Sequence, residues 1–241
     1  MPKSFHQRPL PPTCVAFSSP EGRQLFQEAI VDGHMAIYFP LAEQFTTQTE
    51  PSFCGLATLA MSLNALRVDP CRQWKSAWRW YSDDMLDCCT SVDTVKQKGL
   101  SFDEFIALAR CEGLAAVETR ATPAISLDSF RATVRASCAT STEVLAINYS
   151  RKTLGQTGDG HFSPIGGYHA ASDMVLVMDV ARFKYPPHWV SLPLLFQAMQ
   201  MIDTSSGLPR GFISLRVEAS PQGNPDCCCS SVDQPCLVTA N

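Results

Sequence analysis

The sequence predicts an α+β fold in which a mainly helical N-terminal lobe packs on an antiparallel β-sheet lobe formed by the C-terminal half. Apolar residues recur at helical spacing as far as about residue 138, whereas from Val144 onward short apolar runs are separated by Gly, Ser and Asp. The 241 residues are 45% hydrophobic and 17% charged, which is ordinary for a globular chain with one large core. We expect a main domain over 17–217, an extended arm over 1–16 and a disordered, Cys-containing tail over 218–241.

Four segments of the first half carry helix signals. The first, 19–33, has a serine cap at its start and a glycine stop at its end. The third, 101–113, opens with Ser and Glu in capping-box spacing and also stops at glycine. The fourth covers 126–138. Together with the second, described next, they make the first half mainly helical.

The second helix carries a candidate nucleophile. Apolar residues at 56, 59, 60, 63 and 66 predict a largely buried helix that begins just after Pro51. This puts Cys54 in the first turn, where the helix dipole favours a thiolate. A cysteine without partners is more often a small core residue, so the assignment of Cys54 depends on what the rest of the chain supplies.

The second half supplies a histidine and an acid. Four strand-like runs follow one another, over 144–150, 161–170, 174–183 and 211–217. If the middle two pair around a turn near 169–173, His161 and Asp179 lie opposite each other within a few residues of register. The carboxylate can then hold one ring nitrogen while the other faces a thiol. The alternative is a structural imidazole and a solvated acid at a strand end, which we favour for His169 and His188.

Composition argues against two classes of partner. The net charge of −4 and the pI near 5.7 provide no broad basic field for nucleic acid or an anionic membrane. No apolar signal region follows the first residues, and prolines interrupt the uncharged run over 185–202. Eleven cysteines, an odd number, suggest reduced thiols. We expect a soluble, cytoplasmic protein that acts on a small molecule or peptide.

A glutamine completes the set. Gln48 lies six positions before Cys54, and its amide could stabilise an oxyanion together with the Cys54 backbone N–H. Four longer motifs then resemble the phytochelatin synthases, a family of the papain-like cysteine peptidase clan: QTEPSFCGLA, WKSAWRWYSDDMLDCC, GHFSPIGGYHA and DVARFKYPPHW. The resemblance covers 17–217. It implies a papain-like catalytic domain with Cys54, His161 and Asp179 as the triad and Gln48 as oxyanion donor.

The resemblance also implies an activity. Such an enzyme transfers a γ-glutamylcysteinyl group from glutathione, with release of glycine, to a second glutathione or a growing phytochelatin through a thioester on Cys54. Glutathione, phytochelatin peptides and heavy-metal ions are the implied partners, with no nucleic acid and no membrane. One alternative is a hydrolase on the same fold that removes glycine from glutathione or its S-conjugates. Another is a metal buffer that uses its many thiols without catalysis.

Five further residues are substrate-binding candidates. A γ-glutamyl group presents a free amine and a carboxylate, which call for a fixed acid and a fixed guanidinium. Asp203 and Arg210 flank a short turn and suit these roles, as the resemblance also suggests. Arg182, Lys184 and Tyr185 follow the triad acid and could hold carboxylates of the acceptor. For the two arginines, a surface ion pair is an equal alternative.

The sequence predicts no tightly bound cofactor. Cd²⁺ or Zn²⁺ would act as activator, arriving as a metal–glutathione thiolate that is itself the substrate. Weak thiolate sites are expected at Cys88, Cys89, Cys227, Cys228 and Cys229, whereas packing roles are expected for Cys71, Cys111 and Cys138. The aromatic run over 74–81 is expected to pack in the core or between lobes. A homodimer is a further expectation.

Overall fold

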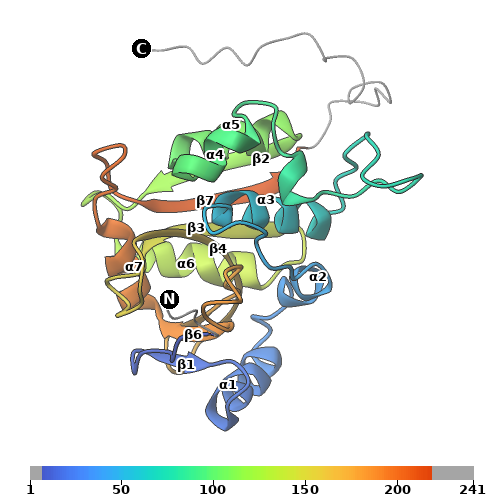
Figure 1. Cartoon of the computed structure of the whole chain (residues 1–241). Helices are drawn as coiled ribbons and strands as arrows, with labels where there is room; N and C mark the ends of the chain where they lie inside the picture. Colours follow the sequence, from blue (N-terminus) through green and yellow to red (C-terminus); the bar gives the residue numbers. More distant parts are fainter. Residues whose placement is uncertain (1–6, 219–241) are drawn as a thin grey trace.

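The computed structural model describes residues 7–218, which form a seven-stranded sheet with helices on both faces (Figure 1). The strand order is β1-β6-β5-β4-β3-β7-β2, and every neighbouring pair is antiparallel. The strands are β1 (Cys14–Ala16), β2 (Leu114–Arg120), β3 (Glu143–Ser150), β4 (Gly160–His169), β5 (Met174–Val177), β6 (His188–Ser191) and β7 (Gly211–Val217). The predicted α+β class is confirmed.

Helices from different parts of the chain cover the two faces of the sheet. Buried residues of the helices α1 to α5 share one core cluster, and those of α6 and α7 share the other. The helices are α1 (Pro20–Val31), α2 (Tyr38–Glu43), α3 (Cys54–Ala65), α4 (Val92–Lys98), α5 (Phe102–Cys111), α6 (Leu127–Cys138) and α7 (Leu192–Gln200), with a short 3₁₀ turn, η1 (Asp83–Met85). No helix in the described range is long and apolar enough to span a membrane.

Strand β3 separates the two clusters. Val144 and Ala146 belong to the cluster beneath α3 and α5, while Leu145 and Ile147 belong to the cluster beneath α6 and α7. All four are fully buried. Successive side chains of a strand point to opposite faces, so a strand covered on both sides needs an unbroken apolar run rather than an alternating one. This explains why the run that begins at Val144 is so apolar.

The end signals of the predicted helices are confirmed. Ser19 accepts a hydrogen bond from the Gly22 backbone N–H at the start of α1, and Ser101 forms a complete capping box at the start of α5. Gly33 and Gly113 follow α1 and α5 with positive φ values of 75° and 85°. Glycine adopts a positive φ without the steric cost that a Cβ imposes, so the helix can end and the chain can turn there.

Several short elements were not predicted. Strand β1 lies within the segment expected to be an extended arm, and it pairs with β6 at one edge of the sheet. Strand β2 forms the other edge and carries exposed residues, so its apolar signal is weak. The strand expected over 174–183 ends at Val177, because the chain then leaves the sheet. Of the tail expected over 218–241, only Glu218 lies within the described residues.

The prediction that the aromatic run over 74–81 packs in the core is wrong for its tryptophans. Trp74, Trp78 and Trp80 are 39%, 74% and 42% exposed, and only Tyr81 is buried. The Trp74 backbone N–H donates to Trp78 O at 2.8 Å, so the segment folds back on itself as a hairpin. In Figure 1 this hairpin, which follows α3, projects away from the sheet. Local pairing thus overrides the burial that its aromatic composition favours.

The cysteines differ from expectation at one place. Cys88 and Cys111 form a disulfide, so the predictions of reduced thiols and of a packing role for Cys111 are wrong for this pair. The two residues are 23 positions apart, at the chain segment before α4 and at the end of α5, and only the fold brings them together. Cys138 is fully buried in the core, which confirms its packing role.

Candidate active site

The candidate nucleophile lies at the first residue of a buried helix. Helix α3 begins at Cys54, as the sequence predicts, and ten of its twelve residues are buried. The next residue is Gly55, where a side chain would not fit: a Cβ at this position would lie 2.9 Å from Leu100 Cδ1. The loop between α4 and α5 can therefore approach the helix start closely. Cys54 itself is only partly buried, so its sulfur can meet a substrate.

The predicted histidine and acid meet. His161 Nε2 lies 2.9 Å from Asp179 Oδ1, and both side chains are buried. His161 is the second residue of β4, and Asp179 follows the end of β5 by two positions. These strands pair antiparallel around a turn at 170–173, with one bulge between Ile165 and Gly167. The register argument from the sequence is confirmed, and Nδ1 of the imidazole is left for the thiol.

A buried arginine, which sequence reasoning missed, also contacts the acid. Arg151 Nη2 donates to Asp179 Oδ1 at 2.9 Å and lies 2.8 Å from Oδ2, and the Arg151 side chain is almost fully buried. Its guanidinium also donates to Gln156 and lies over the Tyr185 ring at 5.2 Å. Burial opposes ionisation of Asp179, but the charges of His161 and Arg151 hold the pKa of this carboxyl well below its usual range. Asp179 is thus a fixed anion.

The surroundings of Cys54 favour its thiolate. Burial of the thiol, the largest single influence, raises the pKa of Cys54, yet the net pKa is below the ordinary cysteine value because the charge and hydrogen bond of His161 and two smaller contributions together outweigh burial. A backbone hydrogen bond from Phe162 and the charge of Arg151 act in the same direction. The start of α3 adds the positive end of a helix dipole. The site can therefore hold a thiolate beside an imidazolium.

Gln48 lies in the same cleft but is already bonded. Its Nε2 donates to the backbone carbonyls of Glu50 at 2.8 Å and Pro51 at 2.9 Å, while Oε1 has no hydrogen-bond partner. An amide nitrogen has two hydrogens, so donation to an oxyanion requires one of these bonds to be exchanged when substrate binds. The oxyanion role of Gln48 stays a prediction.

A cleft of about 520 Å³ joins these residues, a size typical of small-molecule sites. Its walls come from the chain before α3, the α4–α5 loop, the β3–β4 connection with the strand ends beside it, the loop before β6 and the loop after α7. The polar lining residues include Gln48, Cys54, Lys98, Asn148, Arg151, Asp159, His161, Lys184, Asp203 and Arg210. The cleft thus contains fixed anions and cations around the thiol.

Two predicted substrate residues face each other in this cleft. Arg210 is 3% exposed, and its Nη1 lies 3.5 Å from Asp203 Oδ2. Its other contacts are equally long: 3.4 Å from Nη2 to Asp159 Oδ1 and 3.4 Å from Nη1 to Asn148 Oδ1. Arg210 Nε has no hydrogen-bond partner. A buried guanidinium with long contacts and an unpaired N–H retains capacity for an anionic ligand.

The other three substrate candidates lie in different surroundings. Lys184 lines the cleft and donates to Thr157 O at 2.6 Å, and burial followed by the charge of Arg151 lowers its pKa. Arg182 is exposed outside the cleft lining and stacks over the Phe45 ring at 4.7 Å. Tyr185 is buried, and its hydroxyl accepts a hydrogen bond from the Thr157 backbone N–H at 2.9 Å. Only Lys184 is placed to touch a ligand in the cleft.

The remaining histidines of the sheet have structural partners, as expected. His188 is buried with its Nδ1 2.9 Å from Pro186 O. His169 Nε2 lies 2.7 Å from the Glu28 carboxylate of α1. Neither lines the cleft.

No cluster of metal-ligand side chains lies in the cleft among the described residues. The one group of three or more such side chains found between residues 7 and 218 is Cys88, Cys89 and Cys111, outside the cleft lining. The predicted thiolate sites at Cys227, Cys228 and Cys229 lie outside the described residues.

Comparison with known proteins agrees with this arrangement. A family model described as phytochelatin synthase matches residues 5–212. The chain is 48% identical over 221 residues to a glutathione gamma-glutamylcysteinyltransferase of Schizosaccharomyces pombe, covering 92% of this chain and 53% of that protein. It is 51% identical over 211 residues to glutathione gamma-glutamylcysteinyltransferase 2 of Arabidopsis thaliana, covering 87% and 46%. The chain spans about half the length of these curated relatives.

Proposed function

This chain belongs to the phytochelatin synthase family, and from that premise we propose that it is a glutathione γ-glutamylcysteinyltransferase working through an acyl group on Cys54. The observation that carries the proposal is the buried contact of 2.9 Å between His161 Nε2 and Asp179 Oδ1, beside a thiol whose pKa is lowered. The relatives that are named for this activity match this chain over about half of their own length. The residues of the cleft provide its chemistry.

In the first half-reaction, the Cys54 thiolate attacks the carbonyl carbon of the Cys–Gly peptide bond of glutathione. The tetrahedral oxyanion forms near the Cys54 backbone N–H and, after exchange of one hydrogen bond, the Gln48 amide. The intermediate collapses when the C–N bond breaks and the His161 imidazolium gives its proton to the departing glycine amine. The products are free glycine, a neutral imidazole and a γ-glutamylcysteinyl thioester on Cys54.

In the second half-reaction, the α-amine of another glutathione or of a growing peptide attacks the thioester carbonyl. His161 takes a proton from that amine as the new peptide bond forms. The C–S bond breaks, and Cys54 leaves as the thiolate beside an imidazolium. Asp179 keeps the ring oriented in both steps, and Arg151 keeps Asp179 ionised and in place.

Donor recognition is assigned to the charged pair of the cleft. The Asp203 carboxylate suits the free amine of the γ-glutamyl group, and the Arg210 guanidinium suits its carboxylate. The ligand would replace the long contact of 3.5 Å between these side chains with two shorter ones. Lys184 is the candidate for a carboxylate of the acceptor, because it is the member of the predicted acceptor set that lines the cleft.

The activating metal is proposed to enter as part of the substrate. Cd²⁺ and Zn²⁺ bind thiolates, so a bis-glutathione complex can deliver the acceptor with its sulfur already ionised. The proposal requires no resident metal for the chemistry at Cys54. We also propose a cytoplasmic location, where glutathione keeps thiols reduced; the homodimer stays a prediction.

Peptide mass spectrometry of the protein mixed with glutathione and Cd²⁺ tests the proposal. The expected result is a γ-glutamylcysteinyl adduct on the peptide that contains Cys54, release of glycine, and products longer than glutathione by γ-Glu-Cys units. Cys54→Ser should show neither adduct nor glycine release. Glycine release with γ-glutamylcysteine as the sole other product would instead identify the hydrolase. Full glycine release by Cys54→Ser would refute catalysis by this thiol.

A further inference from the structure

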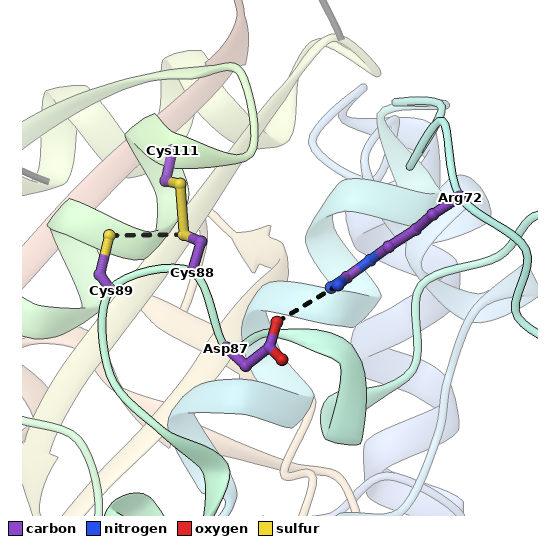
Figure 2. The surroundings of a disulfide bond; sticks show 5 residues. All are labelled: Arg72, Asp87, Cys88, Cys89 and Cys111. Atoms are coloured by element: carbon purple, nitrogen blue, oxygen red, sulfur yellow. Dashed lines mark hydrogen bonds and ion pairs between the residues drawn. A yellow bond between two sulfur atoms is a disulfide. The ribbon is translucent and has the colours of Figure 1, made fainter. Parts of the chain in front are cut away.

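Three cysteine sulfurs converge outside the catalytic cleft. Cys88 and Cys111 are joined as a disulfide, and Cys89 Sγ lies 3.4 Å from Cys88 Sγ (Figure 2). All three sulfurs lie within 4.8 Å of one another. Cys88 and Cys89 precede α4, and Cys111 is the last residue of α5. The fold thus gathers three thiols from two separate segments, which we call the thiol cluster.

We propose that the thiol cluster, when reduced, binds one soft divalent cation such as Cd²⁺ or Zn²⁺. Two sulfurs that each lie about 2.3 Å from a tetrahedral zinc ion are separated by roughly 3.8 Å. Cys89 Sγ lies 3.4 Å from Cys88 Sγ and within 4.8 Å of Cys111 Sγ, and these distances bracket this value. The third pair, Cys88 and Cys111, is bonded in the disulfide, and reduction frees these two sulfurs to move apart toward the same separation. Three thiolates leave the fourth position for water or an external thiolate.

The charge around the cluster favours a cation. An open surface pocket beside it is lined by Cys88, Cys89 and three aspartates, Asp84, Asp87 and Asp93. Arg72 offsets part of this charge, since its Nη1 lies 3.2 Å from Asp87 Oδ1. Figure 2 shows Asp87 turned toward Arg72 and away from the sulfurs. The carboxylates therefore supply long-range attraction, and the sulfurs supply the ligands.

Metal binding and the disulfide exclude each other. Reduction by a small-molecule thiol converts the Cys88–Cys111 bond into two protein thiols while two molecules of the reductant form one disulfide. The three thiols then bind a divalent cation and release three protons, because the ligand is the thiolate. Cys88 and Cys111 are exposed, so both the reductant and the ion can reach them.

The cluster is separate from the catalytic thiol yet connected to its cleft. None of the three cysteines lines the cleft, whereas the far end of α4 and the following loop, 97–100, form part of its wall. The segment before α3 is tied to α4 because Ser52 Oγ donates to Lys96 O at 2.9 Å. The oxidised cluster anchors the chain before α4 to the end of α5. A metal bound there would replace this anchor without occupying Cys54.

Cadmium titration of the reduced chain tests the proposal. The chain is reduced with a phosphine, freed of reductant without oxygen, and titrated with CdCl₂ while the thiolate-to-cadmium charge-transfer absorption is recorded. A Cys54→Ser background removes the contribution of the catalytic thiol, and cysteines elsewhere contribute equally to all variants. Cys89→Ser, Cys88→Ser and Cys111→Ser should each weaken one cadmium site by at least about tenfold, since loss of even an outer partner costs 10–100-fold.

Cys71→Ser is the matched control, because Cys71 lies outside the cluster and is half-buried like Cys89. Cys89→Ser keeps the disulfide pair, so its oxidised form checks that the fold is intact by circular dichroism. Oxidised protein with the disulfide formed should bind one cadmium ion fewer than reduced protein. Equal stoichiometry and affinity in the Cys89→Ser and Cys71→Ser proteins would overturn the site. Equal binding by oxidised and reduced protein would overturn the exclusion between metal and disulfide.

Discussion

Cys54 and Cys138 are both cysteines, but their surroundings shift the pKa of the thiol in opposite directions. Burial disfavours the thiolate at both positions. For Cys138 nothing offsets it, and the pKa is raised far above the ordinary value, whereas at Cys54 the charge and hydrogen bond of His161, helped by the Phe162 backbone N–H and the charge of Arg151, bring the pKa below it. Desolvation alone makes an inert thiol, and desolvation with cations makes a nucleophile. The low pKa of the Cys54 thiol therefore comes from its neighbours, because burial alone would raise it.

The largest expected effect comes from replacing Cys54 by serine, and the same substitution at Cys138 is the comparison. Cys54→Ser should lower glycine release from glutathione by about 10⁶-fold, the scale seen when a nucleophile is removed. Cys138→Ser should keep the activity per folded molecule and lose stability, because a hydroxyl replaces a core thiol. Steady-state rates and thermal unfolding measure both. Substantial activity of the serine variant at position 54 would break the comparison.

Removing the charge of the acid is expected to be next in size. Asp179→Asn keeps the shape but can hold the wrong imidazole tautomer, so kcat should fall by up to about 10⁴-fold. The pKa of Asp179 lies well below its ordinary 3.8, so its ionisation stabilises the fold above that pH and this stabilisation is lost as pH falls further. Acid unfolding should therefore depend less steeply on pH in the variant. An unchanged acid transition would contradict the pairing of Asp179.

Arg151→Met tests the cation that the sequence did not reveal. Its loss leaves Asp179 without its guanidinium partner, and removal of one member of a buried ion pair costs about 3–5 kcal/mol of unfolding free energy. The pKa of Cys54 should rise, because one of its two cations is gone. Chemical denaturation and the pH dependence of Cys54 alkylation report the two effects. Arg151→Lys, which keeps the charge, should recover part of the low thiol pKa.

The smallest of these effects extends the comparison from thiols to guanidinium groups. Arg210 is buried in the cleft, whereas Arg182 is exposed outside it. Arg210→Gln should lower kcat/KM for glutathione by about 10- to 100-fold, the loss expected for a hydrogen bond to a charged group. Arg182→Gln should change it less than about twofold, in line with a surface cation. Equal effects would remove the assignment of Arg210 to the donor.

The placement of Cys54, His161 and Asp179 could be predicted from the sequence, whereas the contact of Asp179 with Arg151 could not. Helical spacing after Pro51 placed Cys54, and the symmetry of two strands about one turn placed His161 opposite Asp179. Both arguments use contacts close along the chain or fixed by strand register. Arg151 follows a strand and precedes Lys152, a pattern typical of a solvated turn, and its burial depends on residues far along the chain.

The same limit explains the other misses. The Cys88–Cys111 disulfide depends on how α4 and α5 fold back, which no local spacing encodes. The hairpin of Trp74 and Trp78 forms by local backbone pairing, although aromatic composition favours burial. The edge strands are short or partly exposed, so their apolar periodicity is weak. The sequence offers five substrate-binding candidates, but only the fold separates those that line the cleft from Arg182 and Tyr185.

The pH dependence of alkylation at Cys54 tests the central claim most directly. Native protein is treated with iodoacetamide over a pH series, and peptide mass spectrometry gives the rate at each cysteine. The account predicts a midpoint for Cys54 below the ordinary thiol pKa of about 8.5, with a shift to higher pH in His161→Gln. A midpoint for Cys54 at or above the ordinary value, unchanged in His161→Gln, would contradict it.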